Sequence, residues 1–236
     1  MKISVCIATY NGEKYIKEQL SSILIQLKDA DEVIISDDNS TDYTLNIINS
    51  INDSRVKVFK NQKCKGYTKN FENALEKASG DIIFLSDQDD VWLPNKVVVM
   101  LNELNKYDFV VSDNIIVDSQ LNTLFESHYA VNNTQPGFLR NLLLPRYVGA
   151  CMAFRRNVLD MSLPFPDNSK LCAHDYWISL IAELYFSARM THQPLILYRR
   201  HDSNASTGGN KSKNTLCHKI KVRLYTLYHL LCRKLR

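Results

Sequence analysis

The sequence has no long hydrophobic run and lacks several common motifs. Its 236 residues contain no stretch of roughly 18–20 uninterrupted apolar residues, the length that a membrane-spanning helix needs. Residues 1–5 lead directly into a strand-like pattern, without the apolar segment and cleavage site of a signal peptide. We therefore expect a cytoplasmic protein. No Gly-x-Gly-x-x-Gly follows the first strand-like segment, which disfavours a dinucleotide-dependent oxidoreductase.

Paired cysteines and late acidic residues are missing as well. The six cysteines are scattered and form no Cys-x-x-Cys pair, so neither a zinc site nor a redox motif is predicted. After Asp202 there is no Asp or Glu, whereas eight Lys and Arg residues follow it. Subtracting these eight charges from the net charge of +4 leaves −4 for the preceding part. The chain is therefore mildly acidic with a strongly basic end.

The basic end has the pattern of an amphipathic helix. A stripe of apolar residues recurs there at spacings of three and four, namely Leu216, Ile220, Leu224, Leu227, Leu231 and Leu235. Two interpretations are open: a helix packed on the rest of the protein, or a basic helix lying on anionic lipid. Nucleic-acid binding is disfavoured, because the rest of the chain is acidic and no recognised motif is present.

The first half of the sequence alternates strand and helix patterns. Short apolar runs at 3–8, 33–35, 56–59 and 82–85 predict strands, and apolar residues at helical spacing lie between them. Such alternation predicts an α/β fold with a mainly parallel, Rossmann-like sheet flanked by helices. Beyond residue 112 the pattern loosens, with a further helix expected at 175–186 and a last strand at 196–199.

Polar clusters follow three of these strands. Thr9-Tyr10-Asn11, Asp37-Asp38 and Asp87–Asp90 each stand at the carboxyl end of a predicted strand. In parallel sheets, ligands bind beyond these ends. We therefore expect the three clusters to meet at one edge of the sheet and to form a binding site.

Acidic residues supply the candidate chemistry. Asp87, Asp89 and Asp90 are close enough to repel one another unless a cation or hydrogen bonds offset the repulsion, and a hard divalent ion with oxygen ligands fits. A solvated turn or a helix cap is the alternative. Asp38 is either part of a capped turn or an acceptor for a nucleotide base or ribose. Asp175 is either a helix N-cap or a general base. His201 is a surface residue, a phosphate contact or a metal ligand.

Together the motifs resemble a known family. They are Val5–Gly12, Ile34–Asp42, Phe84–Trp92, Val148–Arg155, His174–Trp177, and Leu197–His201 with Asn204. In this order, spanning residues 3–204, they resemble glycosyltransferase family 2, which has a GT-A fold, and most of all its bacterial rhamnosyltransferase-like members. The pattern departs from the family at Gly12-Glu13, where relatives often carry a basic residue, and the segment 63–70 matches only loosely.

The resemblance implies an inverting transfer of a sugar. The donor would be dTDP-rhamnose or a UDP-hexose, with Mg²⁺ or Mn²⁺ as the cation, and the acceptor a hydroxyl of a growing polysaccharide or lipid-linked glycan. By position, the resemblance implies nucleotide or diphosphate contacts at Thr9, Tyr10, Asn11, Asp38, Lys69, Asn70 and Asp87. It implies metal ligands at Asp87, Asp89 and His201 and a catalytic base at Asp175. Trp92, Gly149 and His174 would border the acceptor.

The resemblance also implies an organisation. Residues 1–205 would form the GT-A domain, with a nucleotide-sugar half at 1–112 and an acceptor half at 113–205. Residues 206–236 would form a basic linker and amphipathic helix. A lipid-linked acceptor would explain this basic end if 216–236 contacts the inner membrane surface, and packing on the domain stays the alternative. Two rivals remain: a metal-dependent phosphohydrolase, whose Asp-x-Asp usually follows the first strand, and a non-catalytic nucleotide-sugar or glycan-binding module.

Overall fold

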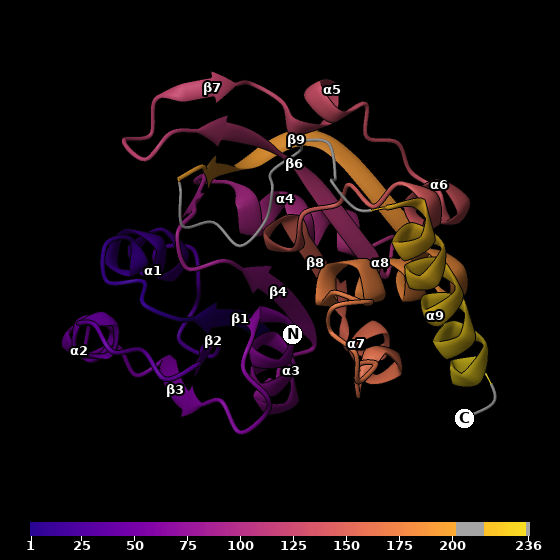
Figure 1. Ribbon diagram of the computed structural model, residues 1–236. Helices are drawn as coiled ribbons and strands as arrows, with labels where there is room; N and C mark the ends of the chain where they lie inside the picture. Colours follow the sequence, from indigo (N-terminus) through magenta and orange to yellow (C-terminus); the bar gives the residue numbers. More distant parts are fainter. Residues whose placement is uncertain (202–214, 235–236) are drawn as a thin grey trace.

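A computed structural model describes residues 1–201 and 215–234 of the chain. One nine-stranded sheet runs through it with helices packed around it (Figure 1). The strands are β1 Ile3–Thr9, β2 Glu32–Asp37, β3 Val56–Lys60, β4 Ile82–Ser86, β5 Val91–Trp92, β6 Phe109–Val117, β7 Thr123–Phe125, β8 Met152–Arg155 and β9 Ala188–Arg199. The helices are α1 Ile16–Leu24, α2 Thr44–Ser50, α3 Tyr67–Lys77, α4 Lys96–Leu104, α5 His128–Asn132, α6 Phe138–Leu143, α7 Arg156–Ser162, α8 His174–Tyr185 and α9 Leu216–Lys234, with a 3-10 turn η1 at Gly149–Cys151.

The first half of the sheet is parallel, as the sequence predicts. Its strand order is β3-β2-β1-β4, and all three pairings are parallel. Every residue of β2 and β4 is buried, which is the pattern of parallel strands covered on both faces. Helices α1 and α3 cover them with the apolar faces that the spacing predicts, including Leu20, Ile23, Phe71 and Leu75.

The second half of the sheet is mixed. Strand β8 lies between β4 and β6 and is antiparallel to both. Strand β9 pairs with β6 in parallel, and the short β5 pairs antiparallel with β9. The expected parallel arrangement therefore stops at β8. The predicted division at residue 112 falls inside β6, so the two halves share one sheet.

Helix α9 packs on the domain through a face that, among the described residues, shares only Leu227 with the predicted stripe. Thr226 and Leu230 are fully buried, and the Tyr185 hydroxyl donates to the Leu230 carbonyl at 2.8 Å. The Arg233 guanidinium lies 5.6 Å from the centre of the Trp177 ring. The predicted linker 206–214 and Leu235 lie outside the described residues. Within those that are described, no helix is long and apolar enough to cross a membrane.

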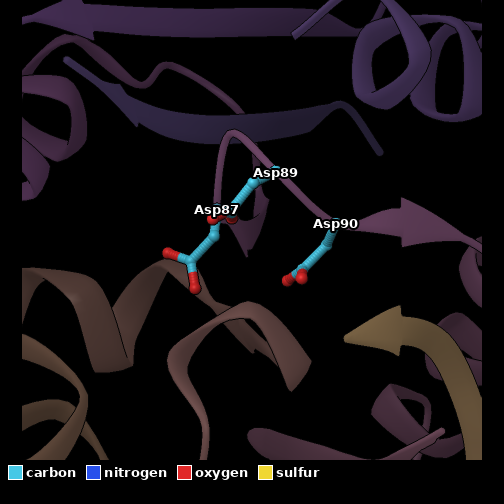
Figure 2. A group of neighbouring side chains, drawn as sticks. All are labelled: Asp87, Asp89 and Asp90. Atoms are coloured by element: carbon cyan, nitrogen blue, oxygen red, sulfur yellow. The ribbon is translucent and has the colours of Figure 1, made fainter. Parts of the chain in front are cut away.

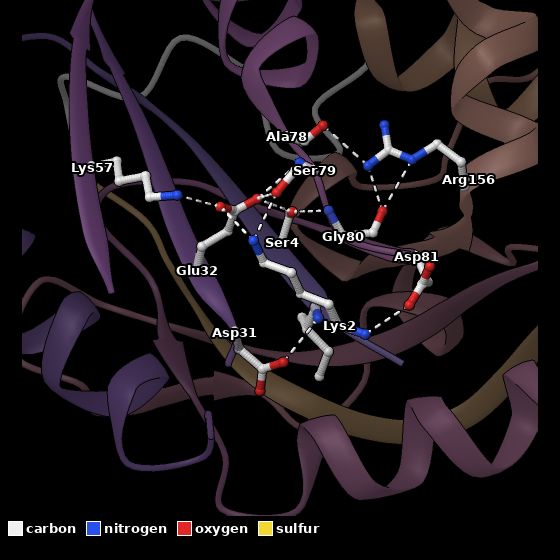
Figure 3. Close-up of polar contacts among 11 residues, drawn as sticks. Lys2, Ser4, Asp31, Glu32, Lys57, Ala78, Ser79, Gly80, Asp81 and Arg156 are labelled. Carbon is white, nitrogen blue, oxygen red and sulfur yellow. Dashed lines mark hydrogen bonds and ion pairs between the residues drawn. The ribbon is translucent and has the colours of Figure 1, made fainter. Parts of the chain in front are cut away.

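A buried glutamate joins the amino ends of the strands (Figure 3). Glu32, at the start of β2, accepts hydrogen bonds from the Ser4 hydroxyl at 2.7 Å and the Ser79 amide at 2.8 Å. Its other oxygen accepts from Lys2 at 3.0 Å and Lys57 at 2.7 Å. Burial acts to raise the pKa of Glu32, but the four partners outweigh burial and hold that pKa well below its usual range.

Replacing Glu32 with Gln should lower the free energy of unfolding at pH 7 by about 2–3 kcal/mol, because charge-assisted hydrogen bonds are lost. A carboxyl group whose pKa is lower in the folded than in the unfolded protein stabilises the fold fully when the pH is above the unfolded-state pKa. That stabilisation is lost as the pH falls toward the folded-state pKa, so the difference from wild type should shrink as the pH falls below about 4.3. Urea unfolding at several pH values measures it.

The matched control is Glu126→Gln, at an exposed position, which should change the free energy of unfolding by less than about 0.5 kcal/mol. A Glu32→Gln deficit of constant size from pH 7 to pH 3 would contradict the assignment.

Candidate active site

A cavity of about 580 Å³ opens at the carboxyl ends of β1 and β4. Most of the residues singled out in the sequence line it, although they come from distant segments. They are Thr9, Tyr10, Asn11, Asp38, Asn70, Asp87, Asp89, Gly149, His174, Asp175 and His201. The expected convergence of the three strand-end clusters is therefore observed.

Two candidates lie elsewhere. Lys69 points its amine at Glu72 Oε2, 2.7 Å away, rather than into the cavity. Trp92 is 3% exposed in the core, where its ring packs 5.5 Å from that of Phe84. The structure thus brings neither side chain to the cavity wall.

Asp38 is fixed at the carboxyl ends of the parallel strands. Its amide donates to the Thr9 carbonyl at 2.9 Å, which fixes the turn after β2 against the end of β1. Its carboxylate accepts from the Asn61 amide group at 2.9 Å and from the Gly66 amide at 2.8 Å. Each oxygen retains a lone pair for a further donor. Asp38 is therefore rigid and still able to accept a hydrogen bond from a ligand.

Asn70 offers a second polar group on the same side. Its Nδ2 donates to the Thr9 carbonyl at 3.0 Å. Among the described residues, its buried Oδ1 has no hydrogen-bond partner. Because a buried carbonyl without a donor is costly, this atom is suited to accept from a bound ligand.

Gln88 ties the acidic turn to the end of β1, a role that its neighbours in the sequence do not reveal. Its Oε1 accepts from the Tyr10 amide at 2.9 Å, and its Nε2 donates to the Tyr10 carbonyl at 3.1 Å. Gly12 makes room for it: a Cβ at Gly12 would lie 2.7 Å from Gln88 Cδ. The glycine found in place of the family's basic residue thus has a structural reason.

Three carboxylates gather on the turn between β4 and β5 (Figure 2). Asp87, Asp89 and Asp90 each offer an oxygen, and these oxygens all lie within 4.8 Å of one another. Asp90 Oδ1 accepts from the Arg199 amide at 2.9 Å, whereas its buried Oδ2 has no partner in the part of the chain that the structure describes. This set of hard oxygen donors, with one buried atom unsatisfied, fits a divalent cation.

Burial and mutual repulsion raise the pKa values of two carboxyl groups in the acidic turn. Burial, and then the charges of Asp89 and Asp175, raise the pKa of Asp87 to about 7. Burial, and then the same kind of repulsion, raise the pKa of Asp90 well above its usual range. Lys96 is fully buried nearby, donates to the Ala150 carbonyl at 2.8 Å, and has its pKa lowered to about 8 by burial. Positive charge would relieve this repulsion.

His201 lies beside the carboxylates of the acidic turn. Its Nε2 lies 2.8 Å from Asp89 Oδ2, and its ring stacks on Tyr15 at 4.9 Å. Arg199 braces the arrangement, because its guanidinium donates to the Asp89 carbonyl at 2.7 Å and lies 4.5 Å from the centre of the Tyr15 ring. The sequence includes Arg199 in a motif but gives no hint that it fixes the acidic turn.

His174 and Asp175 begin α8 on the opposite side of the cavity. The N-cap of α8 is Ala173, so Asp175 is the second helical residue rather than the cap. His174 is buried and stacks on Phe71 with ring centres 4.2 Å apart. Burial lowers the pKa of His174, which keeps its ring neutral near pH 7. Asp175 is only partly buried and lines the cavity.

Gly149 lets the η1 turn approach these two residues closely. A Cβ at Gly149 would lie 2.9 Å from His174 Nε2 and 3.3 Å from Asp175 Cβ. The adjoining segment before η1 also lines the cavity with Arg146 and Tyr147. Tyr147 is fixed by donating to Glu183 at 2.8 Å. Sequence patterns do not point to either residue.

Comparison with known proteins identifies the family. The family model for glycosyl transferase family 2 matches residues 4–162, and the chain therefore belongs to this family. A UDP-Glc:alpha-D-GlcNAc-diphosphoundecaprenol beta-1,3-glucosyltransferase of Escherichia coli is 30% identical over 222 residues, covering 91% of this chain and 82% of the relative. A dTDP-rhamnosyl transferase of Shigella flexneri is 32% identical over 226 residues, covering 87% and 74%.

Solved structures confirm the GT-A fold. TarS of S. aureus, in complex with UDP-GlcNAc, superposes with a TM-score of 0.68 at 21% identity, covering 96% of this chain and 72% of that one. Glucosyl-3-phosphoglycerate synthase of Mycobacterium tuberculosis, in complex with Mn²⁺ and UDP, gives 0.61 at 19% identity, covering 98% and 79%. The chain is a family 2 glycosyltransferase, and the phosphohydrolase and non-catalytic readings are disfavoured.

Gly149→Ala should reduce kcat/KM by about ten- to a hundredfold, because a displacement of the catalytic side chains by about 1 Å costs that order of rate. Initial-rate assays measure the loss, and the melting temperature and nucleotide affinity should stay close to wild type. Wild-type kcat/KM in Gly149→Ala would show that the approach of η1 to α8 does not set the geometry of the site.

Proposed function

We propose that the protein transfers a sugar from a nucleotide-diphosphate sugar to a hydroxyl group, with inversion at the anomeric carbon. One observation carries the proposal: a single cavity is lined on one side by Asp38, Asn70 and the acidic turn and on the other by Asp175. A nucleotide end, a diphosphate end and a general base are thereby arranged around one space, with Thr9, Tyr10 and Asn11 on the nucleotide side.

In this mechanism Asp175 accepts the proton of the acceptor hydroxyl. The acceptor oxygen forms a bond to the anomeric carbon while the bond from that carbon to the diphosphate oxygen breaks, and its electrons pass to the diphosphate. Attack on the face opposite the leaving group inverts the configuration. His174 and Gly149 border the acceptor and fix the start of α8, where Asp175 lies.

Asp87, Asp89 and Asp90, with His201 beside them, would hold Mg²⁺ or Mn²⁺. The cation would offset the negative charge that develops on the departing nucleoside diphosphate. The carboxylate cluster described above supports this, as does Mn²⁺ in the complex of the synthase with the same fold. Asp90 is added to the ligands expected from the sequence because its Oδ2 is buried in the cluster.

The donor is proposed to be dTDP-rhamnose or a UDP-hexose, and the acceptor a lipid-linked or polysaccharide glycan. The names of the two relatives support this, since one is a UDP-Glc-dependent glucosyltransferase for a diphosphoundecaprenol-linked sugar and the other is a dTDP-rhamnosyl transferase. We further propose that the protein works at the cytoplasmic face of the membrane, with 216–236 as the contact. The division into a GT-A domain at 1–205 and this basic end is part of the same proposal.

Asp175→Asn should lower kcat by about 10²–10⁴-fold, the usual contribution of a general base, and leave nucleotide binding nearly unchanged. Transfer assays and nucleotide titrations measure the two effects. Asp160→Asn, at an exposed position on α7, is the matched control and should retain full activity. Turnover at the wild-type rate in Asp175→Asn would refute the role of general base.

Asp89→Asn should remove the metal-dependent part of nucleotide-sugar binding. For wild type, we expect a UDP-sugar or dTDP-sugar to raise the melting temperature more with Mn²⁺ than without, because ligands that bind the native state stabilise it. Asp29→Asn, an exposed control, should respond as wild type. If Mn²⁺ increased the rise in melting temperature as much in Asp89→Asn as in wild type, the metal assignment would be wrong. If no nucleotide sugar raised the melting temperature of wild type, the donor assignment would be wrong.

A further inference from the structure

Helix α9 has a second apolar face that points away from the protein. Its members are three or four positions apart and form one stripe along the helix, here called the outer stripe. They are Leu216 (74% exposed), Ile220 (50%), Leu224 (63%), Tyr228 (64%) and Leu231 (67%).

The exposure of the outer stripe does not result from a loosely attached helix. The other face is docked: Thr226 and Leu230 are buried, and the Tyr225 hydroxyl accepts from the Asn168 amide at 3.0 Å. Arg233 donates to the Leu163 carbonyl at 2.8 Å. One face of α9, which includes Leu227, therefore packs on the domain. The other described members of the predicted leucine stripe lie on the face that the fold leaves uncovered.

Helix α6 extends the apolar surface. Arg223 of α9 donates to the Leu143 carbonyl at 2.7 Å, which brings the end of α6 beside α9. Leu139 and Leu143 of α6 and the following Leu144 are all more than half exposed. The next residues, Pro145 and Arg146, already line the active-site cavity. The apolar surface therefore reaches the acceptor side of the cavity.

The charge of this surface favours an anionic lipid surface over a second copy of the chain as the partner that covers it. Neither α6 nor α9 contains an acidic residue, whereas Arg140, Lys219, Lys221 and Arg223 lie on them. Two acids lie close by: Glu183 beneath α6, whose Oε1 accepts from the Gly137 amide and the Tyr147 hydroxyl, and Asp167, which lies near His229 and Arg233 on the docked side of α9. A second copy of the chain would bring positive charges against positive charges. An anionic lipid surface would attract them and also accept the apolar side chains.

We propose that the outer stripe and the exposed leucines of α6 rest on an anionic lipid surface, with the acceptor side of the cavity turned toward it. The acceptor's lipid would then stay in the membrane while its sugar enters the cavity past Arg146. This inference rests on the proposed function, because it takes the acceptor to be lipid-linked.

The test uses the full chain and vesicles of phosphatidylcholine, with and without 30% phosphatidylglycerol. The outer-stripe variant carries Ile220→Gln, Leu224→Gln and Leu231→Gln, which keep a good helix former at exposed positions. The control carries Ile25→Gln, Val98→Gln and Leu124→Gln, which are equally apolar and exposed but lie elsewhere. Cosedimentation measures binding, and transfer to a soluble acceptor without a lipid measures activity.

Wild type and the control should bind the anionic vesicles, and both should bind neutral vesicles at least tenfold more weakly. The outer-stripe variant should bind anionic vesicles at least tenfold more weakly than wild type, with unchanged transfer to the soluble acceptor. Equal binding by wild type and the outer-stripe variant would overturn the proposal. So would a wild-type dimer that binds no vesicles and that the outer-stripe variant converts to a monomer. Loss of transfer to every soluble acceptor in all three proteins would count against the proposed function instead, since vesicle binding is read independently.

Discussion

Parallel pairing of three strands determines where the ligand-binding residues of this enzyme lie. In the register of β1 with β2, Thr9 stands opposite Asp37, and in the register of β1 with β4, Ile7 stands opposite Ser86. Parallel strands end at the same edge, so the residues that follow them leave the sheet side by side. Shifting either pairing by one residue would exchange the two buried faces of a strand and place its side chains against the wrong helices, and for this reason the core also fixes the site.

Buried carboxylates at the two ends of these strands have opposite surroundings: they are fully hydrogen-bonded at one end and crowded together at the other. At the amino ends, Glu32 has partners for both oxygens, and its pKa is lowered. At the carboxyl ends, the pKa values of Asp87 and Asp90 are raised, and Asp90 Oδ2 has no partner among the described residues. The first arrangement stabilises the fold. The second is unfavourable without a ligand, which is typical of functional sites that retain local conflict within a stable scaffold.

Sequence patterns are sufficient for the parallel half of the fold and for most of the cavity. Helical and strand periodicity is strong in residues 3–86, and each polar cluster there directly follows a buried strand. The rest depends on contacts that no local pattern records. Strand β8 runs antiparallel to both of its neighbours, and Arg199 reaches the acidic turn from β9, which pairs with β5 although it lies about a hundred residues later in the chain. Trp92, placed near the acceptor by resemblance, is buried in the core. For α9 the spacing predicts the helix correctly but not which face packs on the domain.

The contact between Gly12 and Gln88 has a consequence for how the acidic turn is anchored. Any side chain at position 12 would occupy the space that the Gln88 amide uses to hold Tyr10. A side chain at position 12 would therefore require the Gln88 amide, the far end of a flexible side chain, to move and to give up its two hydrogen bonds to Tyr10. Positions 12 and 88 are 76 residues apart in the chain, and the anchoring of the acidic turn to the end of β1 depends on both of them.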